Sequence, residues 1–327
     1  MTVHARPQPP RDCGGGVWLK GPVIGRRNWV AGLVAAALPL PASAASAEPA
    51  VKVVDIGGGV GLHYLEAGRG PALVFIHGSL GNLFYWSDQI GPFSERFRTI
   101  AYSRRYNYPN TNAAVSGYSA IVDAEDLAGL ILKLGLAPCH VVGHSYGAFT
   151  ALVLATRRPD LVRAVTLAEA PAMSLLQHVP PPDTDAGRAM FADVNARMVA
   201  PMVAAFSEGR REDGVRVFID YVLGPRAWEA MSPLDKAETL REAEEWDVML
   251  PHGELFPEVA PAAVSAVRLP TLLLSGARSY PFLRLIDEAL LALLPQRRHI
   301  VFPKAGHQMW LQEPDACRRA VFDLAGR

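Results

Sequence analysis

The sequence predicts an α/β fold, in which a mostly parallel β-sheet is covered by helices on both faces. From residue 72 onward, short apolar runs of strand length alternate with longer segments whose apolar residues recur at helical spacing. Half of the 327 residues are hydrophobic and only 20% are charged, which is enough apolar material for the core of one large domain. Strands that alternate with helices favour parallel pairing, because each crossover helix returns the chain to the same edge of the sheet.

Composition excludes several function classes. The 32 basic and 32 acidic residues cancel, so the chain lacks the basic excess of a nucleic-acid binder and is too apolar for a disordered chain. Its three cysteines form no C-x-x-C pair, which argues against a disulfide scaffold and a cysteine-rich zinc site. We expect neither a nucleic-acid partner nor a metal site.

Residues 1–47 have the features of an export signal. Five basic residues and one acid precede a short apolar run at 30–40, and small residues lead to Ala44 and Ala47. A run of this length cannot span a bilayer, which needs ~20 residues. The adjacent Arg26 and Arg27 favour the twin-arginine variety. We therefore expect recognition by the export machinery, cleavage near Ala47, a periplasmic or secreted product and no stable membrane anchor.

Cleavage after Ala47 would change both charge and cysteine content. The mature chain would hold 27 basic and 31 acidic residues, a net charge of −4. It would lose Cys13 and keep Cys139 and Cys317. An oxidising compartment permits a disulfide between these two, but their spacing does not indicate one.

Eight strands are expected in the mature chain. The first two, at 51–56 and 62–66, flank the run Gly57–Gly61, which is interpreted as a turn because it lacks G-x-G-x-x-G spacing. The others are expected at 72–77, 99–103, 140–143, 164–168, 271–275 and 299–302. Helices are expected at 119–134, at about 147–157 and after each of the last two strands.

One segment interrupts the alternation. Between about Pro171 and Arg268 the sequence shows helical patterns at 186–206, 215–222 and 235–245, separated by prolines, and no convincing strand. We interpret residues 171–268 as a helical cap inserted between two strands, within a single domain at 48–327.

Gly143-His144-Ser145-Tyr146-Gly147 fits G-x-S-x-G and lies between a predicted strand and a predicted helix, the context of a nucleophile elbow. The sharp turn lifts Ser145 Oγ clear of the sheet, and the helix N-terminus faces the negative charge that develops during attack. Ser145 is the predicted nucleophile; the alternative is an idle serine on a surface turn.

Two further segments complete the predicted site. His307 lies between the last strand and the terminal helix, where a general base can reach the serine. His77-Gly78-Ser79 ends an earlier strand, so the backbone N–H groups of Ser79 and Tyr146 are the predicted oxyanion hole. We expect His77 itself to brace the loop rather than to transfer protons.

These motifs, with the cap and the late Gly306-His307, resemble the α/β-hydrolase superfamily over nearly all of residues 51–327. Ser103–Tyr106, Glu169–Pro171 and Gly276–Ser279 are similar to a bacterial subgroup of it. The resemblance implies hydrolysis by a Ser-acid-His triad without metal or organic cofactor. A serine nucleophile argues against the epoxide hydrolases and haloalkane dehalogenases of the same fold, which use Asp there.

The third triad member departs from the commoner superfamily pattern. The acid usually follows the strand after the cap, as Asp in G-x-x-D, but here Ser279 holds that position and carries no charge at pH 7. Asp287 falls too far along the next helix. Glu169 stands at the tip of the strand before the cap, where some α/β-hydrolases place their acid. We predict Glu169 as the acid, with a cap-hinge role as the alternative.

The sequence therefore predicts a serine hydrolase that acts on a small-molecule carboxylic ester or lactone through an acyl-enzyme. C–C bond or amide hydrolysis by the same triad, and a catalytically silent binding protein, are the alternatives. Aromatic residues could line an apolar pocket or pack in the core, namely Phe84, Tyr85, Trp86 and Trp246. Arg104 and Arg105 could approach the pocket mouth, but ion pairing is the expected role.

Overall fold

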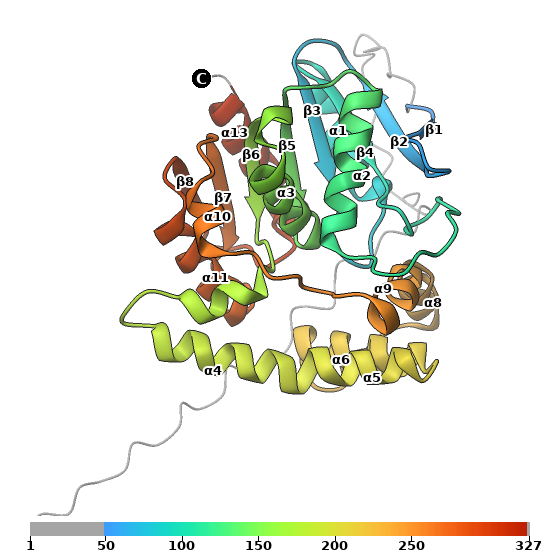
Figure 1. Cartoon of the computed structure of the whole chain (residues 1–327), viewed down its shortest axis with the longest axis vertical. Coiled ribbons are helices and arrows are strands. Elements are labelled where there is room, and N and C mark those ends of the chain that lie inside the picture. The colour runs from blue at the N-terminus through green and yellow to red at the C-terminus, as the bar shows by residue number, and fades with distance from the viewer. Residues whose placement is uncertain (1–48, 326–327) are drawn as a thin grey trace, which may run out of the picture. The chain divides into compact units, whose positions relative to one another are not determined.

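The computed structural model describes residues 49–325, which form an eight-stranded sheet with helices on both faces (Figure 1). The strand order is β1-β2-β4-β3-β5-β6-β7-β8; the pairs β1–β2 and β2–β4 are antiparallel and the others parallel. This confirms the predicted fold class. Every predicted strand is present within two residues of its expected ends: β1 (Lys52–Asp55), β2 (Gly61–Ala67), β3 (Ala72–Ile76), β4 (Arg98–Tyr102), β5 (Cys139–His144), β6 (Val162–Ala168), β7 (Thr271–Gly276) and β8 (Arg297–Phe302).

Successive side chains of the central strands point to opposite faces, where different helices cover them. On β3, Val74 and Ile76 join one buried cluster and Leu73 and Phe75 the other. The first cluster contains residues of α2 (Ala120–Lys133), α3 (Tyr146–Arg157) and α11 (Pro281–Leu293); the second contains residues of η1 (Leu83–Trp86), α1 (Ser87–Ser94), α12 (Met309–Gln312) and α13 (Pro314–Ala325). Burial on both faces is what anchors the ends of the strands in fixed positions.

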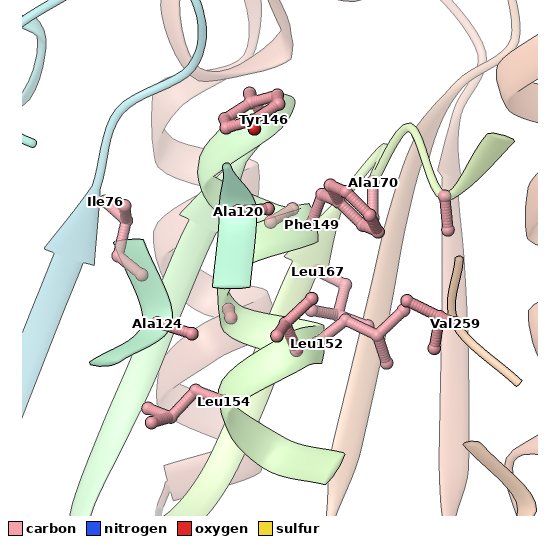
Figure 2. Packing of buried hydrophobic residues seen from close by; sticks show 14 of the residues in the cluster. Ile76, Ala120, Ala124, Tyr146, Phe149, Leu152, Leu154, Leu167, Ala170 and Val259 are labelled. Atoms are coloured by element: carbon pink, nitrogen blue, oxygen red, sulfur yellow. The ribbon is translucent and has the colours of Figure 1, made fainter. Parts of the chain in front are cut away.

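Figure 2 shows the α3 side of this core, where Phe149 and Leu152 of the helix lie beside Leu167 of β6. All three side chains are fully buried. Val259, near the end of the segment interpreted as the cap, is in the same cluster, so the core and the cap share apolar packing.

The segment between β6 and β7 is helical, and its longest helices lie across one end of the sheet (Figure 1). The expected helix at 235–245 is divided at Ala243 into α8 (Pro233–Glu242) and α9 (Glu244–His252). The helices of this segment are η3 (Met173–His178), α4 (Thr184–Val194), the π-helix η4 (Asn195–Val199), α5 (Ala200–Ser207), α6 (Arg211–Leu223), α7 (Ala227–Ala230), α8 (Pro233–Glu242), α9 (Glu244–His252) and α10 (Pro261–Ser265).

The continuous stretch Thr184–Ser207 is long and apolar enough, by length and composition alone, to cross a membrane, with a mean hydropathy of 1.2. Its buried side chains, among them Val194, Met198 and Met202, belong to the core of the domain. We interpret the stretch as a cap helix. The predicted export signal, residues 1–47, lies outside the described residues.

Cys139 on β5 and Cys317 on α13 are buried free thiols, so these two residues form no disulfide. Burial raises the pKa of each thiol to about 12. Both side chains therefore act as small apolar core residues.

Candidate active site

Ser145 occupies the sharp turn between β5 and α3. Its backbone has φ 54° and ψ −125°, a left-handed conformation that a residue with a side chain rarely adopts. The Ser145 N–H donates to the carbonyl of Ala168 at 2.8 Å, which fixes the turn to the end of β6. A Cβ on Gly147 would lie 2.4 Å from the carbonyl oxygens of Ile76 and His77, so only glycine fits there. Strain of this kind is commonly stored at functional sites.

Glu169 and His307, which are distant in sequence, meet beside this turn. Glu169 directly follows β6, and His307 follows β8. The Nδ1 of His307 lies 2.5 Å from Oε2 of Glu169, whose side chain is fully buried. A carboxylate accepts from Nδ1–H, which leaves Nε2 of a neutral His307 ring as the proton acceptor.

The Glu169 carboxylate is held by two further donors. The backbone N–H of Gly276 donates to Oε1 at 2.8 Å, and the hydroxyl of Ser279 donates to Oε2 at 2.6 Å. Glu169 itself has a positive φ of 53°. Ser279 thus stands at the position where the commoner pattern has its acid and supports the glutamate instead, a role that the sequence analysis missed.

His144 is a second residue whose place the sequence did not reveal. Its Nε2 lies 2.8 Å from the backbone carbonyl oxygen of His307, and its ring stacks on Tyr85 at 5.2 Å. Burial lowers the pKa of His144 to about 3, so the ring is neutral and its Nε2–H can donate to that carbonyl. The motif G-x-S-x-G marks this position but does not indicate the direction of its side chain.

The loop after β3 passes close to the serine. A Cβ on Gly78 would lie 2.8 Å from Cβ and 3.4 Å from Oγ of Ser145, so the backbone of this loop contacts the nucleophile position directly. His77 is fully buried, and its Nδ1 donates to the carbonyl of Gly78 at 2.8 Å while its Nε2 accepts from the N–H of Arg104 at 3.1 Å. Burial lowers the pKa of His77 well below its ordinary value. These contacts fit the bracing role expected from the sequence.

Within residues 49–325, Ser145 Oγ makes no hydrogen bond to His307 or to another side chain. Ser145 is partly exposed, and the His307 side chain is 12% exposed. The rings of His307 and His144 lie 4.7 Å apart, which keeps the imidazole next to the elbow. Catalytic hydrogen bonds are often long or poorly aligned in the absence of substrate, so the lack of this bond does not exclude His307 as the base.

The structure corrects the pocket hypothesis for two aromatic residues. Trp86 is fully buried and stacks on Phe75 at 4.4 Å, in the core beneath the sheet. Trp246 is 1% exposed and packs against Phe206 and Phe218 inside the cap. Both were candidates because aromatic composition alone does not distinguish a pocket wall from a core.

The remaining residues considered in the sequence analysis, two arginines and one aspartate, have structural partners. Arg104 and Arg105 form the expected ion pairs, Arg104 with Asp123 and Arg105 with Asp126. Asp287 is buried in α11 and accepts from the Ser275 hydroxyl, while the carboxylate beside His307 Nδ1 is that of Glu169. No group of three or more His, Cys, Asp or Glu side chains in the described part of the chain is arranged to hold a metal ion.

A cavity of about 420 Å³ opens at the opposite end of the sheet, near the start of β3 and β7, and is lined by residues such as Pro71, Thr271 and Arg298. It contains none of the residues at the elbow. The candidate site is therefore identified by its chemistry and backbone geometry, not by the volume of a cavity.

Comparison with known proteins supports a hydrolase. A family model of the alpha/beta hydrolase fold matches residues 71–200. The chain is 29% identical over 282 residues to a 2-(acetamidomethylene)succinate hydrolase from Mesorhizobium japonicum, covering 82% of this chain and 92% of the relative. It is 34% identical to epoxide hydrolase 3 of Mus musculus over 122 residues, 36% of this chain and 33% of that protein.

Among solved structures, carboxylesterase CesB from Bacillus subtilis aligns with a TM-score of 0.63 and 21% identity, covering 86% of this chain and 93% of the other. At this identity the likeness shows a common fold. The relatives agree on hydrolysis and differ in the bond that they cleave.

Proposed function

We propose, from the premise that this chain is an enzyme of the α/β-hydrolase superfamily, that it hydrolyses carboxylic esters or lactones through a Ser145–His307–Glu169 triad. The observation that carries the proposal is the strained serine elbow beside the Glu169–His307 pair. Strained backbone at both Ser145 and Glu169 supports a functional role for the two residues, because such strain persists only where the surrounding structure imposes it.

In the proposed reaction Ser145 Oγ attacks the substrate carbonyl carbon while Nε2 of His307 accepts its proton. Glu169 holds the Nδ1–H tautomer and stabilises the imidazolium. His307 then protonates the leaving alkoxide, which departs as the alcohol and leaves an acyl-enzyme. A water molecule, deprotonated by the same imidazole, attacks the acyl carbon; the bond from that carbon to Ser145 Oγ then breaks, His307 returns the proton to Oγ, and the carboxylic acid leaves.

The negative charge on the substrate oxygen needs donors that are fixed before the reaction begins. We propose the backbone N–H groups of Ser79 and Tyr146. Tyr146 is the first residue of α3, so its N–H has no acceptor in the preceding turn of that helix, and the helix dipole adds positive potential there. Ser79 follows Gly78, whose backbone contacts the elbow.

Labelling with a fluorophosphonate probe tests the nucleophile. We expect the purified protein to react at Ser145 and the Ser145→Ala variant to show neither labelling nor activity. A panel of p-nitrophenyl esters of increasing acyl length, together with lactones, then tests the substrate class. A folded protein that is not labelled would instead favour a catalytically silent binding protein.

Amide hydrolysis by the same triad is a second candidate. It is favoured by the identity with the Mesorhizobium japonicum relative, whose name specifies an acetamido compound and of which this chain covers 92%. Amide substrates in the same panel separate the two candidates, because both require Ser145 and they differ only in the leaving group.

A further inference from the structure

Arg104 is a fully buried arginine two residues after β4, and it contacts the loop that approaches Ser145. Its Nη1 donates to Asp123 of α2 at 2.9 Å, and its Nη2 lies 2.5 Å from Glu245 of the cap helix α9. Although burial acts against its charge, Glu245 and Asp123 raise the pKa of Arg104 well above its ordinary value. The guanidinium is therefore a permanent cation held by two carboxylates, one from the core and one from the cap.

The same guanidinium contacts Tyr146 and the residue that precedes Ser79, Gly78. Nη2 donates to the carbonyl oxygen of Gly78 at 3.3 Å. The guanidinium carbon lies 4.8 Å from the centre of the Tyr146 ring, within cation–π range. An arginine that served only to pair with Asp123 would need neither contact.

The Gly78 carbonyl and the Ser79 N–H belong to one planar peptide unit, in which they point in opposite directions. Two donors, Nδ1 of His77 and Nη2 of Arg104, hold the carbonyl on one side. The N–H of Ser79 is thereby directed to the other side, and a cation on the carbonyl increases the polarity of the N–H.

We propose that Arg104 is a positioning residue of the oxyanion hole and that Glu245 of the cap holds Arg104 in place. The position of the cap on the core is thereby coupled to the geometry of the catalytic site. This inference rests on the proposed function, because it assumes that the Ser79 N–H stabilises the oxyanion. It assigns a role to the buried Arg104–Glu245 pair beyond structural ion pairing.

The test compares Arg104→Lys with Arg105→Lys as the matched control. Lysine keeps the buried charge opposite Asp123 and Glu245 but lacks the planar fork that also reaches Gly78. Arg105 is the neighbouring arginine; it pairs with Asp126, and its side chain makes no hydrogen bond or ion pair with the Gly78 loop within the described residues. We expect Arg104→Lys to lower kcat about tenfold, with little change in KM, since one oxyanion donor is misaligned rather than lost.

The affinity for a boronic acid, whose tetrahedral adduct with Ser145 places an oxygen in the oxyanion hole, should fall by a similar factor in Arg104→Lys. The kcat, the KM and the boronic acid affinity of Arg105→Lys should all stay within about twofold of the wild-type values. A lower melting temperature with unchanged kcat and inhibitor affinity would give Arg104 a purely structural role and overturn the proposal, as would equal losses in both variants.

If Arg104→Lys does not fold, Glu245→Leu provides the decisive measurement. It removes the cap carboxylate and leaves Arg104 balanced by Asp123, so no buried charge is left unpaired. We expect a several-fold loss of kcat matched by loss of boronic acid affinity; wild-type values would overturn the proposal. Failure of fluorophosphonate labelling in the wild type would instead contradict the proposed function, so the two failures are distinguishable.

Discussion

The carboxylate beside His307 comes from Glu169, while the position where the commoner pattern has its acid is held by Ser279. Its carboxylate accepts from Gly276, Ser279 and His307, all within 2.8 Å. Hydrogen bonds to an ionised group are roughly twice as strong as neutral ones. Three of them at once define the orientation of the carboxylate, and the left-handed backbone at Glu169 turns the side chain toward His307.

Replacement of Glu169 by glutamine tests its proposed catalytic role. Glutamine keeps the shape but cannot stabilise an imidazolium, and its NH₂ group can face Nδ1 and impose the wrong tautomer. We expect kcat to fall by ~10⁴, the size of the comparable Asp→Asn effect in a serine protease. Steady-state kinetics on a p-nitrophenyl ester, with circular dichroism to establish folding, measure the effect.

Ser279→Ala is the matched comparison at the same carboxylate. It removes one of three donors and leaves Gly276 and His307 in place. We expect a loss of a few-fold, far smaller than that of Glu169→Gln. A fully active, folded Glu169→Gln enzyme would exclude Glu169 as the triad acid.

At the scale of elements, the carboxyl ends of β5, β6 and β8 supply the serine, the glutamate and the histidine. Parallel strands end at the same edge of the sheet, so three residues that are remote in sequence lie together. β6 lies between β5 and β7 in the sheet. An acid placed after β6 is therefore adjacent to the elbow, and the longer Glu side chain reaches a histidine presented from the far side of β7.

Glu245 of the cap helix α9 should make the stability of the protein depend on pH. Burial raises the pKa of this carboxyl from 4.5 to about 7; Arg104 opposes the shift and Asp123 adds to it. The buried hydroxyls of Tyr118 and Tyr146 are in the same cluster and stay protonated, because burial raises their pKa values well above 10.

The folded chain binds a proton at Glu245 over a pH range in which the unfolded chain has released it. The free energy of unfolding should therefore fall as pH rises from about 4.5 to about 7, by at most ~1.4 kcal/mol per unit from this group. The glutamine of Glu245→Gln cannot titrate, so the free energy of unfolding of this variant should fall less steeply with pH, by the amount that Glu245 contributes in the wild type. Urea denaturation across this range measures the difference, and identical slopes for the two proteins would contradict the shifted pKa.

At the scale of the whole molecule, much of the fold could be predicted because it depends on local pattern. Apolar runs of strand length located all eight strands, and the residues at their ends located Ser145, Glu169 and His307. The Glu169–His307 contact was expected from the place of Glu169 at the tip of the strand before the cap, where some α/β-hydrolases have their acid. Trp86 could not be assigned, because its burial depends on Phe75 and Trp310 from other parts of the chain.

Contacts that depend on the direction of a side chain could not be predicted from the sequence. His144 binds the carbonyl of a residue 163 positions away, and no periodicity carries that information. Arg104 was correctly expected to form ion pairs, but its cap partner Glu245 lies in a segment where only helical spacing could be read. Such contacts arise from the packing of distant segments against one another, which is a property of the assembled domain.

The last prediction concerns the route that the whole chain takes. We propose that residues 1–47 direct export through the twin-arginine pathway, on the strength of Arg26-Arg27 ahead of a short apolar run. Replacing both with lysine keeps the positive charge of the segment, so a pathway that reads only charge and hydrophobicity should be unaffected. We expect the Arg26→Lys/Arg27→Lys chain to stay in the cytoplasm with its first 47 residues attached, while the wild type appears in the periplasm with a new N-terminus near Ala47. Cell fractionation and N-terminal sequencing measure both; normal export of the double variant would rule out the twin-arginine route, and retention of the wild type would rule out export.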